Sequence, residues 1–306
     1  MKAVKKSANN LQRIKFYGLK FAIKKIKKIY IIYIVALLLT IPYSIIMDLK
    51  DSSLATSIFM AILKFIGCAT LLQSVSGSSY TSHALVATTW FLSTLFICYI
   101  FCPFLYKRTS RIPKKYDKLA LSIIILLTFL ISQLVTMIEK ASMSMGIIYV
   151  NDLYYGSPYS RIWFIILGMI IAKTYIDHPN KKYNPVLNLF VWIMIIMWNI
   201  IRNTIFPYKE ILRLIDVIVV TLLINLLLQN QDPVSAFCSN KLASTSKHIM
   251  LVYVYHLPII WYINILWDSL NLNSIFKDFS NISQFCIVVI IQYFVVIIWK
   301  KVNPQP

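Results

Sequence analysis

Acidic residues and glycines are both scarce in this chain of 306 residues. Only 11 residues are Asp or Glu, against 31 Lys and Arg, and charged residues together make up 14% of the sequence. Soluble domains carry about 25% charged and roughly 45–50% apolar residues, whereas this chain is 58% hydrophobic. A chain this apolar has too little polar surface to fold in water. We therefore expect a protein that crosses a bilayer several times.

Several classes of functional site are excluded because their residues are missing. Six glycines in the whole chain argue against a phosphate-binding loop and against a transporter with several unwound Gly-rich helices. Neither a Gly-x-Ser-x-Gly elbow nor a His-Glu-x-x-His motif occurs. The five cysteines lack metal-ligand or disulfide spacing, and Cys98 and Cys102 share a helix face as packing residues. The sequence therefore predicts neither a metal site nor a bound cofactor.

The net charge of +20 is concentrated in short segments between apolar stretches. Ten of the first 28 residues are Lys or Arg, which makes residues 1–28 a basic arm in front of a membrane domain at 29–306. Basic segments of this kind face the cytoplasm and contact anionic lipid. They indicate a membrane partner rather than nucleic acid.

Eight apolar stretches approach the ~20 residues that a helix needs to cross a bilayer. They are residues 29–47, 84–106, 118–138, 159–176, 185–206, 210–230, 248–267 and 281–299. A ninth stretch, 54–75, carries Lys64, and its crossing would place the basic segment 107–118 outside, against the positive-inside rule. We expect it to lie in the interface or to be re-entrant. The predicted fold is an all-α bundle of about eight transmembrane helices, with both termini cytoplasmic.

Ionisable residues inside predicted spans are candidates for function, because lipid penalises them. His256 lies near mid-bilayer, and Pro258 frees the carbonyl of Val254 beside it. This pattern suits a ligand or proton-handling site, with a packing histidine as the alternative. Arg213 and Asp216 lie three residues apart near an outer helix end. They form either an intrahelical ion pair or part of a polar outer pocket for a hydroxylated or anionic substrate.

Four segments spread along the chain carry a pattern seen in one known family. They are Lys25-Ile26-Lys27-Lys28 through Tyr33; Thr89-Trp90-Phe91-Leu92-Ser93 with Tyr99 and Pro103; Tyr155-Gly156-Ser157-Pro158 through Arg161 and Leu167-Gly168-Met169; and Tyr253-Val254-Tyr255-His256-Leu257-Pro258. In this order and spacing, over about residues 20–300, they resemble the bacterial membrane acyltransferases of family three. That family O-acylates cell-surface sugars using acyl-CoA.

The chain departs from that family at its N-terminal side. Lys25 and Lys28 stand where the family commonly has Arg, and Ile31 stands where it has Pro. Lys keeps a charge for a CoA phosphate but lacks the bidentate fork of Arg. The family also begins with two more spans, the first of which carries an essential His. Since residues 1–28 contain no apolar run approaching 18 residues, we expect those two spans to be lacking.

The resemblance implies an O-acyltransferase that moves an acetyl group from acetyl-CoA to a cell-surface glycan or a lipid-linked sugar. Lys25 and Lys28 would hold CoA phosphates, and His256 would be the general base, although it does not match the position of the family's His. Residues expected to bind the acceptor are Trp90, Arg161, Arg202, Arg213 and Asp216, with bilayer anchoring as the alternative for Trp90. Two other hypotheses are a glycan or lipid transporter and a non-catalytic membrane partner.

Overall fold

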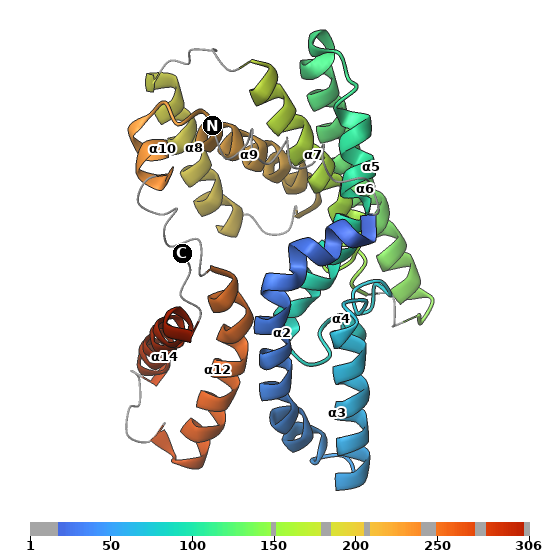
Figure 1. Ribbon diagram of the computed structural model, residues 1–306, viewed down its shortest axis with the longest axis vertical. Helices are drawn as coiled ribbons and strands as arrows, with labels where there is room; N and C mark the ends of the chain where they lie inside the picture. The colour runs from blue at the N-terminus through green and yellow to red at the C-terminus, as the bar shows by residue number, and fades with distance from the viewer. Residues whose placement is uncertain are drawn as a thin grey trace. The chain divides into compact units, whose positions relative to one another are not determined.

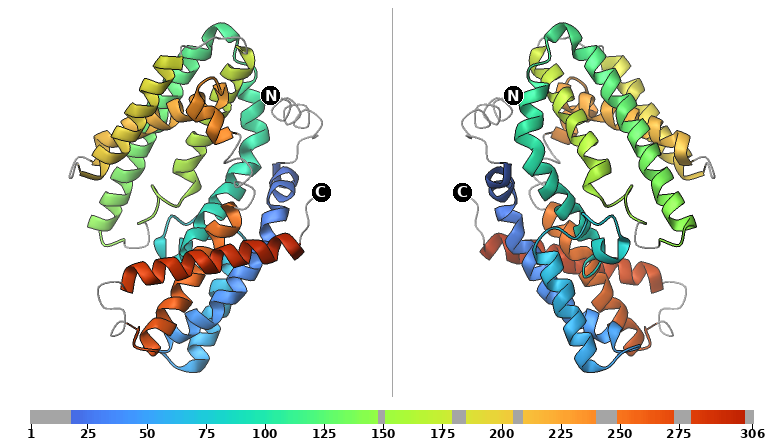
Figure 2. Two further views of the ribbon diagram at one scale, coloured as in Figure 1. Left: turned by 90° about the vertical axis from the view of Figure 1, so that its left-hand side faces the viewer. Right: turned by 90° about the vertical axis from the view of Figure 1, so that its right-hand side faces the viewer.

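The computed structural model describes residues 18–147, 151–178, 185–204, 209–239, 249–272 and 280–302. Figures 1 and 2 show helices throughout these ranges, and none of the residues in them forms a strand. The longer helices are α2 (Gly18–Asp48), α3 (Leu54–Ala69), α5 (Trp90–Thr109), α6 (Asp117–Ser144), α7 (Pro158–Asp177), α8 (Pro185–Thr204), α9 (Lys209–Gln229), α12 (Ile249–Ser269) and α14 (Ser280–Val302). Short helical turns are α4 (Ser79–Ser82), η1 (Ala87–Thr89), η2 (Lys114–Tyr116) and α10 (Pro233–Phe237).

The helices confirm an all-α protein that crosses the membrane several times. Within the described ranges, six helices are long and apolar enough to span a bilayer: Gly18–Asp48, Ala87–Thr109, Lys114–Ser144, Pro158–Asp177, Ile249–Ser269 and Ile282–Trp299. Two shorter apolar helices are Leu54–Ala69 and Val186–Arg202. Each predicted span overlaps a helix in the described residues, but six rather than eight qualify. Helix α8 lies in the predicted span 185–206 and is one of the shorter ones, and α9, in the predicted span 210–230, is in neither group.

Helix α2 begins well before the first predicted span. Residues Gly18–Lys28, counted with the basic arm on sequence grounds, continue into the apolar part of α2 as one helix. Phe21, Ala22 and Ile26 are buried on one face of this extension, while Lys24 and Lys25 are exposed. Lysine is a good helix former and keeps its charged end in water, so a basic segment with buried apolar positions remains helical.

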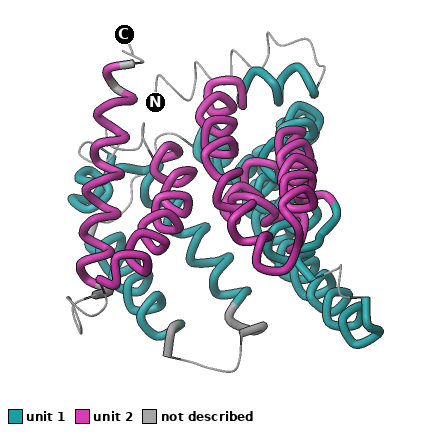
Figure 3. Tube along the Cα trace, turned by 90° about the horizontal axis from the view of Figure 1, so that it is seen from below, with its two compact units in different colours: residues 1–25, 76–78, 94–244 teal, residues 26–75, 79–93, 245–306 magenta. Residues whose placement is uncertain are grey.

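The chain forms two compact units, shown in different colours in Figure 3. Unit 1 comprises residues 1–25, 76–78 and 94–244, and unit 2 comprises residues 26–75, 79–93 and 245–306.

In unit 1, α6, α7 and α9 pack around an apolar centre with polar groups at both ends. The buried centre consists of Ile124, Leu167, Ile170, Ile171 and Val217. At one end, Lys173 of α7 lies between Asp117 and Asp177, with Nζ–Oδ distances of 2.5 and 2.6 Å. The other end is formed by the last turns of α6 and the first turns of α7 and α9.

In unit 2, α3 packs against α2 through tyrosine hydroxyls and an ion pair. Tyr30 and Tyr33 donate to the carbonyls of Ala69 and Cys68, both at 2.8 Å. Lys64 Nζ lies 2.7 Å from Asp48, so its charge is compensated within the helix pair. A helix of 16 residues is about 24 Å long, less than the ~30 Å hydrocarbon core, in keeping with the predicted interfacial or re-entrant segment.

The largely non-helical segment between α3 and α5 has buried polar side chains, among them Gln73 and Ser74 of unit 2. The Ser74 backbone N–H donates to Ser93 Oγ at 3.1 Å, and Ser93 Oγ donates to the Leu71 carbonyl at 2.9 Å. Gln73 Nε2 donates to Tyr33 Oη at 3.1 Å. Irregular backbone at membrane depth is tolerated only where protein groups satisfy it. These side chains supply such partners, and the segment ends at Trp90, where α5 begins.

Candidate functional site

The tautomer of the neutral His256 ring follows from a contact within its own helix. Its Nδ1 lies 2.8 Å from the carbonyl oxygen of Tyr253, three residues earlier on α12. Because a carbonyl only accepts, Nδ1 is the donor, and in the neutral ring Nε2 keeps a lone pair. Among the residues that the structure describes, Nε2 has no hydrogen-bond partner. His256 therefore presents a proton acceptor to whatever occupies the space beside it.

That space is a groove of about 480 Å³ between α12 and α14. Its lining is apolar apart from four polar side chains, and it consists of Val252, His256, Ile260, Asn264, Gln284, Phe285, Val288, Val289 and Gln292. The volume lies within the range of roughly 300–1,000 Å³ typical of small-molecule sites, which combine apolar walls with a few polar groups. The groove can hold part of a sugar or an acyl group next to the imidazole.

The polar groups occur at two levels of the groove. The helices run antiparallel, because the early α12 residues Leu251 and Val254 pack with Val295 and Trp299 late in α14. His256 and Asn264 are eight residues apart on α12, as are Gln284 and Gln292 on α14. Eight residues correspond to about 12 Å of helix, so hydroxyls could be bound at two points along the groove.

The turn of α12 that carries His256 is held by the segment before α5. Tyr253 Oη donates to the carbonyl of Thr88 at 2.9 Å, and its ring packs edge-on against Phe91 at 5.7 Å between centroids. Trp90, between these two contact residues, is the first residue of α5 and is buried at 8% exposure. The structure thus brings residues on both sides of the predicted Trp90 onto the His256 turn, whereas Trp90 itself packs against Phe91 and does not line the groove.

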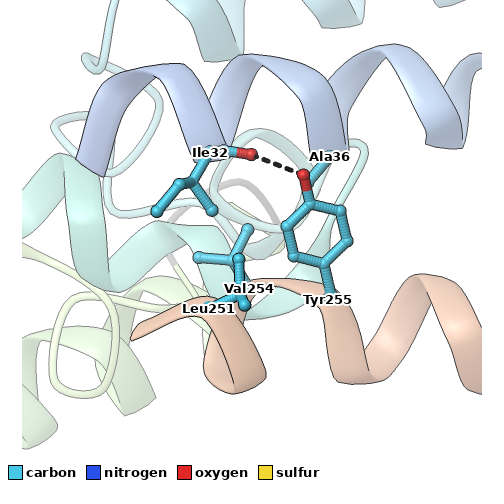
Figure 4. Packing of buried hydrophobic residues seen from close by; sticks show 5 residues of the cluster. All are labelled: Ile32, Ala36, Leu251, Val254 and Tyr255. Atoms are coloured by element: carbon cyan, nitrogen blue, oxygen red, sulfur yellow. Dashed lines mark hydrogen bonds between the residues drawn. The ribbon is translucent and has the colours of Figure 1, made fainter. Parts of the chain in front are cut away.

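A second contact fixes α12 against α2. Ile32 and Ala36 of α2 pack against Leu251, Val254 and Tyr255, as Figure 4 shows. The Tyr255 hydroxyl donates to the carbonyl of Ile32 at 3.2 Å, drawn as a dashed line in Figure 4. These residues cover the side of α12 next to α2, while His256 lines the groove. Helix α12 continues through the buried Pro258 to Ser269.

The two lysines predicted to bind CoA phosphates are exposed on α2. Lys25 and Lys28 lie three residues apart, close to one helical turn, and neither has an ion-pair partner among the described side chains. Lys25 Nζ lies 5.5 Å from the centroid of the Phe21 ring. Their charges are available to a ligand.

Arg161 and Arg213 meet around one tyrosine in unit 1. Arg213 Cζ lies 3.9 Å and Arg161 Cζ 5.7 Å from the centroid of Tyr154. Arg161 donates from Nε and Nη2 to the Tyr155 carbonyl at 3.0 and 2.8 Å, and Arg213 Nη1 donates to Thr136. These two predicted acceptor residues therefore form one cluster.

Asp216 pairs with a residue of the neighbouring helix. Its carboxylate lies 3.2 Å from Arg202 Nη2 of α8 and accepts from Trp198 Nε1 at 3.0 Å. The alternative of an ion pair between Arg213 and Asp216 is wrong, because Arg213 turns toward Tyr154 and α6 instead. Arg202 and Asp216 join α8 to α9 and balance each other's charge.

Several residues of these sites escaped the sequence analysis. Asn264, Gln284 and Gln292 are neutral amides, whereas the sequence criterion for a candidate site was an ionisable residue inside a predicted span. The spacing of eight residues from His256 to Asn264 and from Gln284 to Gln292 is a usable signal in apolar helices, since polar groups in lipid need partners. Tyr154 had no signal, because its importance comes from helices distant in sequence.

A comparison with protein families identifies the chain. The family model described as an acyltransferase domain matches residues 11–299. The chain belongs to acyltransferase family three. The match includes most of the basic segment at Lys25 and Lys28, the whole of α12 and nearly all of α14, as the resemblance predicted. Searches of curated proteins and of solved structures gave no match. Family membership and the helices together support a membrane acyltransferase in general.

Proposed function

We propose that this protein transfers an acetyl group from acetyl-CoA to a hydroxyl of a cell-surface glycan or a lipid-linked sugar. The observation that carries the proposal is the acceptor nitrogen Nε2 of His256, which lines a groove of ligand size within the family's domain. The proposed location is the bacterial cytoplasmic membrane.

The chemistry follows from the histidine tautomer. Nε2 of His256 takes the proton of the acceptor hydroxyl as its oxygen attacks the thioester carbonyl carbon. A C–O bond forms, the C–S bond breaks, and the CoA thiolate leaves with the electron pair of the C–S bond. The imidazolium then returns the proton to the sulfur. The Tyr253 carbonyl keeps Nδ1 protonated throughout and orients the ring.

The groove amides position the acceptor. Gln292 and Asn264 line the same groove as His256, and an amide both donates to and accepts from a sugar hydroxyl. The apolar lining at Ile260 and Val288 excludes water, which would otherwise compete as acyl acceptor.

Lys25 and Lys28 bind the acyl donor, acetyl-CoA. Their exposed ammonium groups on α2 attract the phosphates of CoA, and the positive-inside rule supports a cytoplasmic position for this basic segment. Loss of either charge should raise the KM for acetyl-CoA more than it lowers kcat.

The test uses labelled acetyl-CoA and membranes from cells producing the chain. Label should appear in the glycan fraction with the unmodified protein and fall about 100-fold or more with His256→Ala, as for loss of a general base. His83→Ala is the matched control, since His83 lies in unit 2 but does not line the groove. Equal transfer by both variants would remove His256 from the mechanism.

A further inference from the structure

The arginine cluster of unit 1 has a feature that the chemistry at His256 leaves unused. Three helix ends meet there: the end of α6 and the starts of α7 and α9. Each brings a residue to Tyr154: Glu139 from α6, Ser160 from α7 and Arg213 from α9. Thr136 of α6 joins the cluster by accepting from Arg213.

Arg213 keeps most of its hydrogen-bonding capacity. A guanidinium carries five N–H groups, and Arg213 directs Nη1 to Thr136 Oγ1. In the part of the chain that the structure describes, no other hydrogen-bond partner contacts it. The Glu139 carboxylate interacts with it electrostatically but forms no ion pair within 4.0 Å. Arg202, by contrast, is paired with Asp216. Arg213 therefore retains N–H groups available to an oxyanion.

Its surroundings hold the guanidinium in place. The Tyr154 backbone N–H donates to Glu139 Oε2 at 3.2 Å, and Ser160 donates to the Tyr154 carbonyl at 2.6 Å. The backbone of Tyr154 is thus held on both sides of its Cα, and the Arg213 Cζ lies 3.9 Å from the centroid of the Tyr154 ring. Thr136, which accepts from Arg213, is itself buried at 8% exposure. A planar cation stacked and held in this way is organised for two parallel hydrogen bonds.

Exposed aromatic rings lie next to the cluster. Tyr155 and Tyr159 are 55% and 51% exposed; Tyr155 precedes α7, and Tyr159 lies in its first turn. The Tyr155 ring centroid lies 5.5 Å from Arg161 Cζ. Tyrosines combine an apolar face with a hydroxyl, which suits the face and edge of a sugar ring.

We propose that Arg213 binds an oxyanion, a carboxylate or a phosphate, carried by the acceptor saccharide. This inference rests on the proposed function only in naming the acceptor as the carrier. Phospholipid headgroups present the same oxyanion chemistry, so the experiment separates the two sources.

Binding is measured without any acyl donor. The full chain, in nanodiscs of zwitterionic phosphatidylcholine, is titrated with oligogalacturonate and with a neutral maltooligosaccharide of equal length. The unmodified chain should bind the acidic probe about tenfold or more tightly than the neutral one, as charge-assisted hydrogen bonds require. Equal binding of the two probes would overturn the proposal.

Matched variants locate the effect. Arg213→Gln should abolish the preference for the acidic probe, and Arg213→Lys should keep part of it because the charge remains. Arg108→Gln is the control, since Arg108 is exposed and also lies over an aromatic ring, with Cζ 5.2 Å from the Phe104 centroid. A loss with Arg108→Gln as large as that with Arg213→Gln would refute the assignment. Monodisperse elution in size-exclusion chromatography and an unchanged Tm show that a variant is folded. If Arg213→Gln does not fold, the reduced preference of Arg213→Lys for the acidic probe is measured instead.

Two further arms separate the alternatives. In nanodiscs containing phosphatidylglycerol the preference for oligogalacturonate should persist. The proposal is overturned if the preference for oligogalacturonate disappears in these nanodiscs while phosphatidylglycerol stays bound to the unmodified chain and not to Arg213→Gln. That result would assign the site to lipid. In His256→Ala the binding should be unchanged although transfer is lost. Failure of the anion site and failure of the acyl-transfer chemistry therefore give different results.

Discussion

Replacing Lys173 by Met should destabilise unit 1 strongly. Lys173 Nζ bridges Asp117 and Asp177 at 2.5 and 2.6 Å, and its side chain is 14% exposed. The Asp117 side chain is only 2% exposed, and its Oδ2 accepts no hydrogen bond, with His178 Nε2 3.6 Å away. Removing the lysine leaves two carboxylates facing each other without their common cation.

The magnitude follows from burial. Breaking a buried ion pair by deleting one partner costs ~3–5 kcal/mol, whereas an exposed pair contributes about 1 kcal/mol or less. Lys114 provides the matched control, because it approaches the same Asp177 at 4.0 Å with a side chain that is 68% exposed. Lys114→Met should therefore change the free energy of unfolding by less than about 1 kcal/mol.

The assay is reversible unfolding in mixed micelles with increasing SDS, followed by tryptophan fluorescence. Asp117→Asn in the Lys173→Met background should recover a substantial part of the loss, since it removes the uncompensated buried charge. The reasoning fails if Lys173→Met and Lys114→Met give the same free energy of unfolding. It also fails if Asp117→Asn destabilises the Lys173→Met variant as much as it destabilises the unmodified chain.

Two other predictions concern pH and a glycine. Burial alone would raise the pKa of Asp232, but hydrogen bonds from the start of α10 and from Trp192 Nε1 outweigh it and lower the pKa below its usual 3.8. The carboxylate therefore stabilises the fold at neutral pH, and this stabilisation is lost as the pH falls through the folded-state pKa. Trp192 fluorescence should be constant from about pH 7 to about pH 4 and change only at lower pH. The variant Asp232→Asn should not show this change. Gly156→Ala should lower the free energy of unfolding by about 1–3 kcal/mol, because its Cβ would overlap the Asp152 carboxylate. Gly168→Ala, whose Cβ would meet no atom within 4 Å, should be neutral or raise it by about 0.5–1 kcal/mol, and thermal scans that ranked the two variants equally would refute this.

The helices could be predicted from the sequence because lipid imposes length and apolarity on every span. The start of α2 differs from the predicted span 29–47, because the uncharged run begins only after Lys28 whereas the helix does not end at charged residues. Lys24 and Lys25 keep their charged ends exposed while Phe21 and Ile26 are buried, and the helix extends to Gly18.

The candidate sites could be predicted only in part. His256 stood out because an ionisable group in an apolar helix is costly, but the partners that define its groove lie on α14. Arg213 and Asp216 were correctly marked as polar residues at a helix end, yet their partners were not predictable. Arg213 contacts Thr136, which is 77 residues away in sequence, and helical periodicity carries no information on such contacts.

Chemical rescue of His256→Ala is the most direct test of the mechanism. The variant is assayed with labelled acetyl-CoA in membranes, with and without added imidazole, after its Tm has shown that it is folded. If His256 is the general base, transfer to glycan is lost and imidazole restores it in a concentration-dependent way. Transfer that persists in His256→Ala without imidazole, or a folded variant that imidazole fails to rescue, would contradict the mechanism.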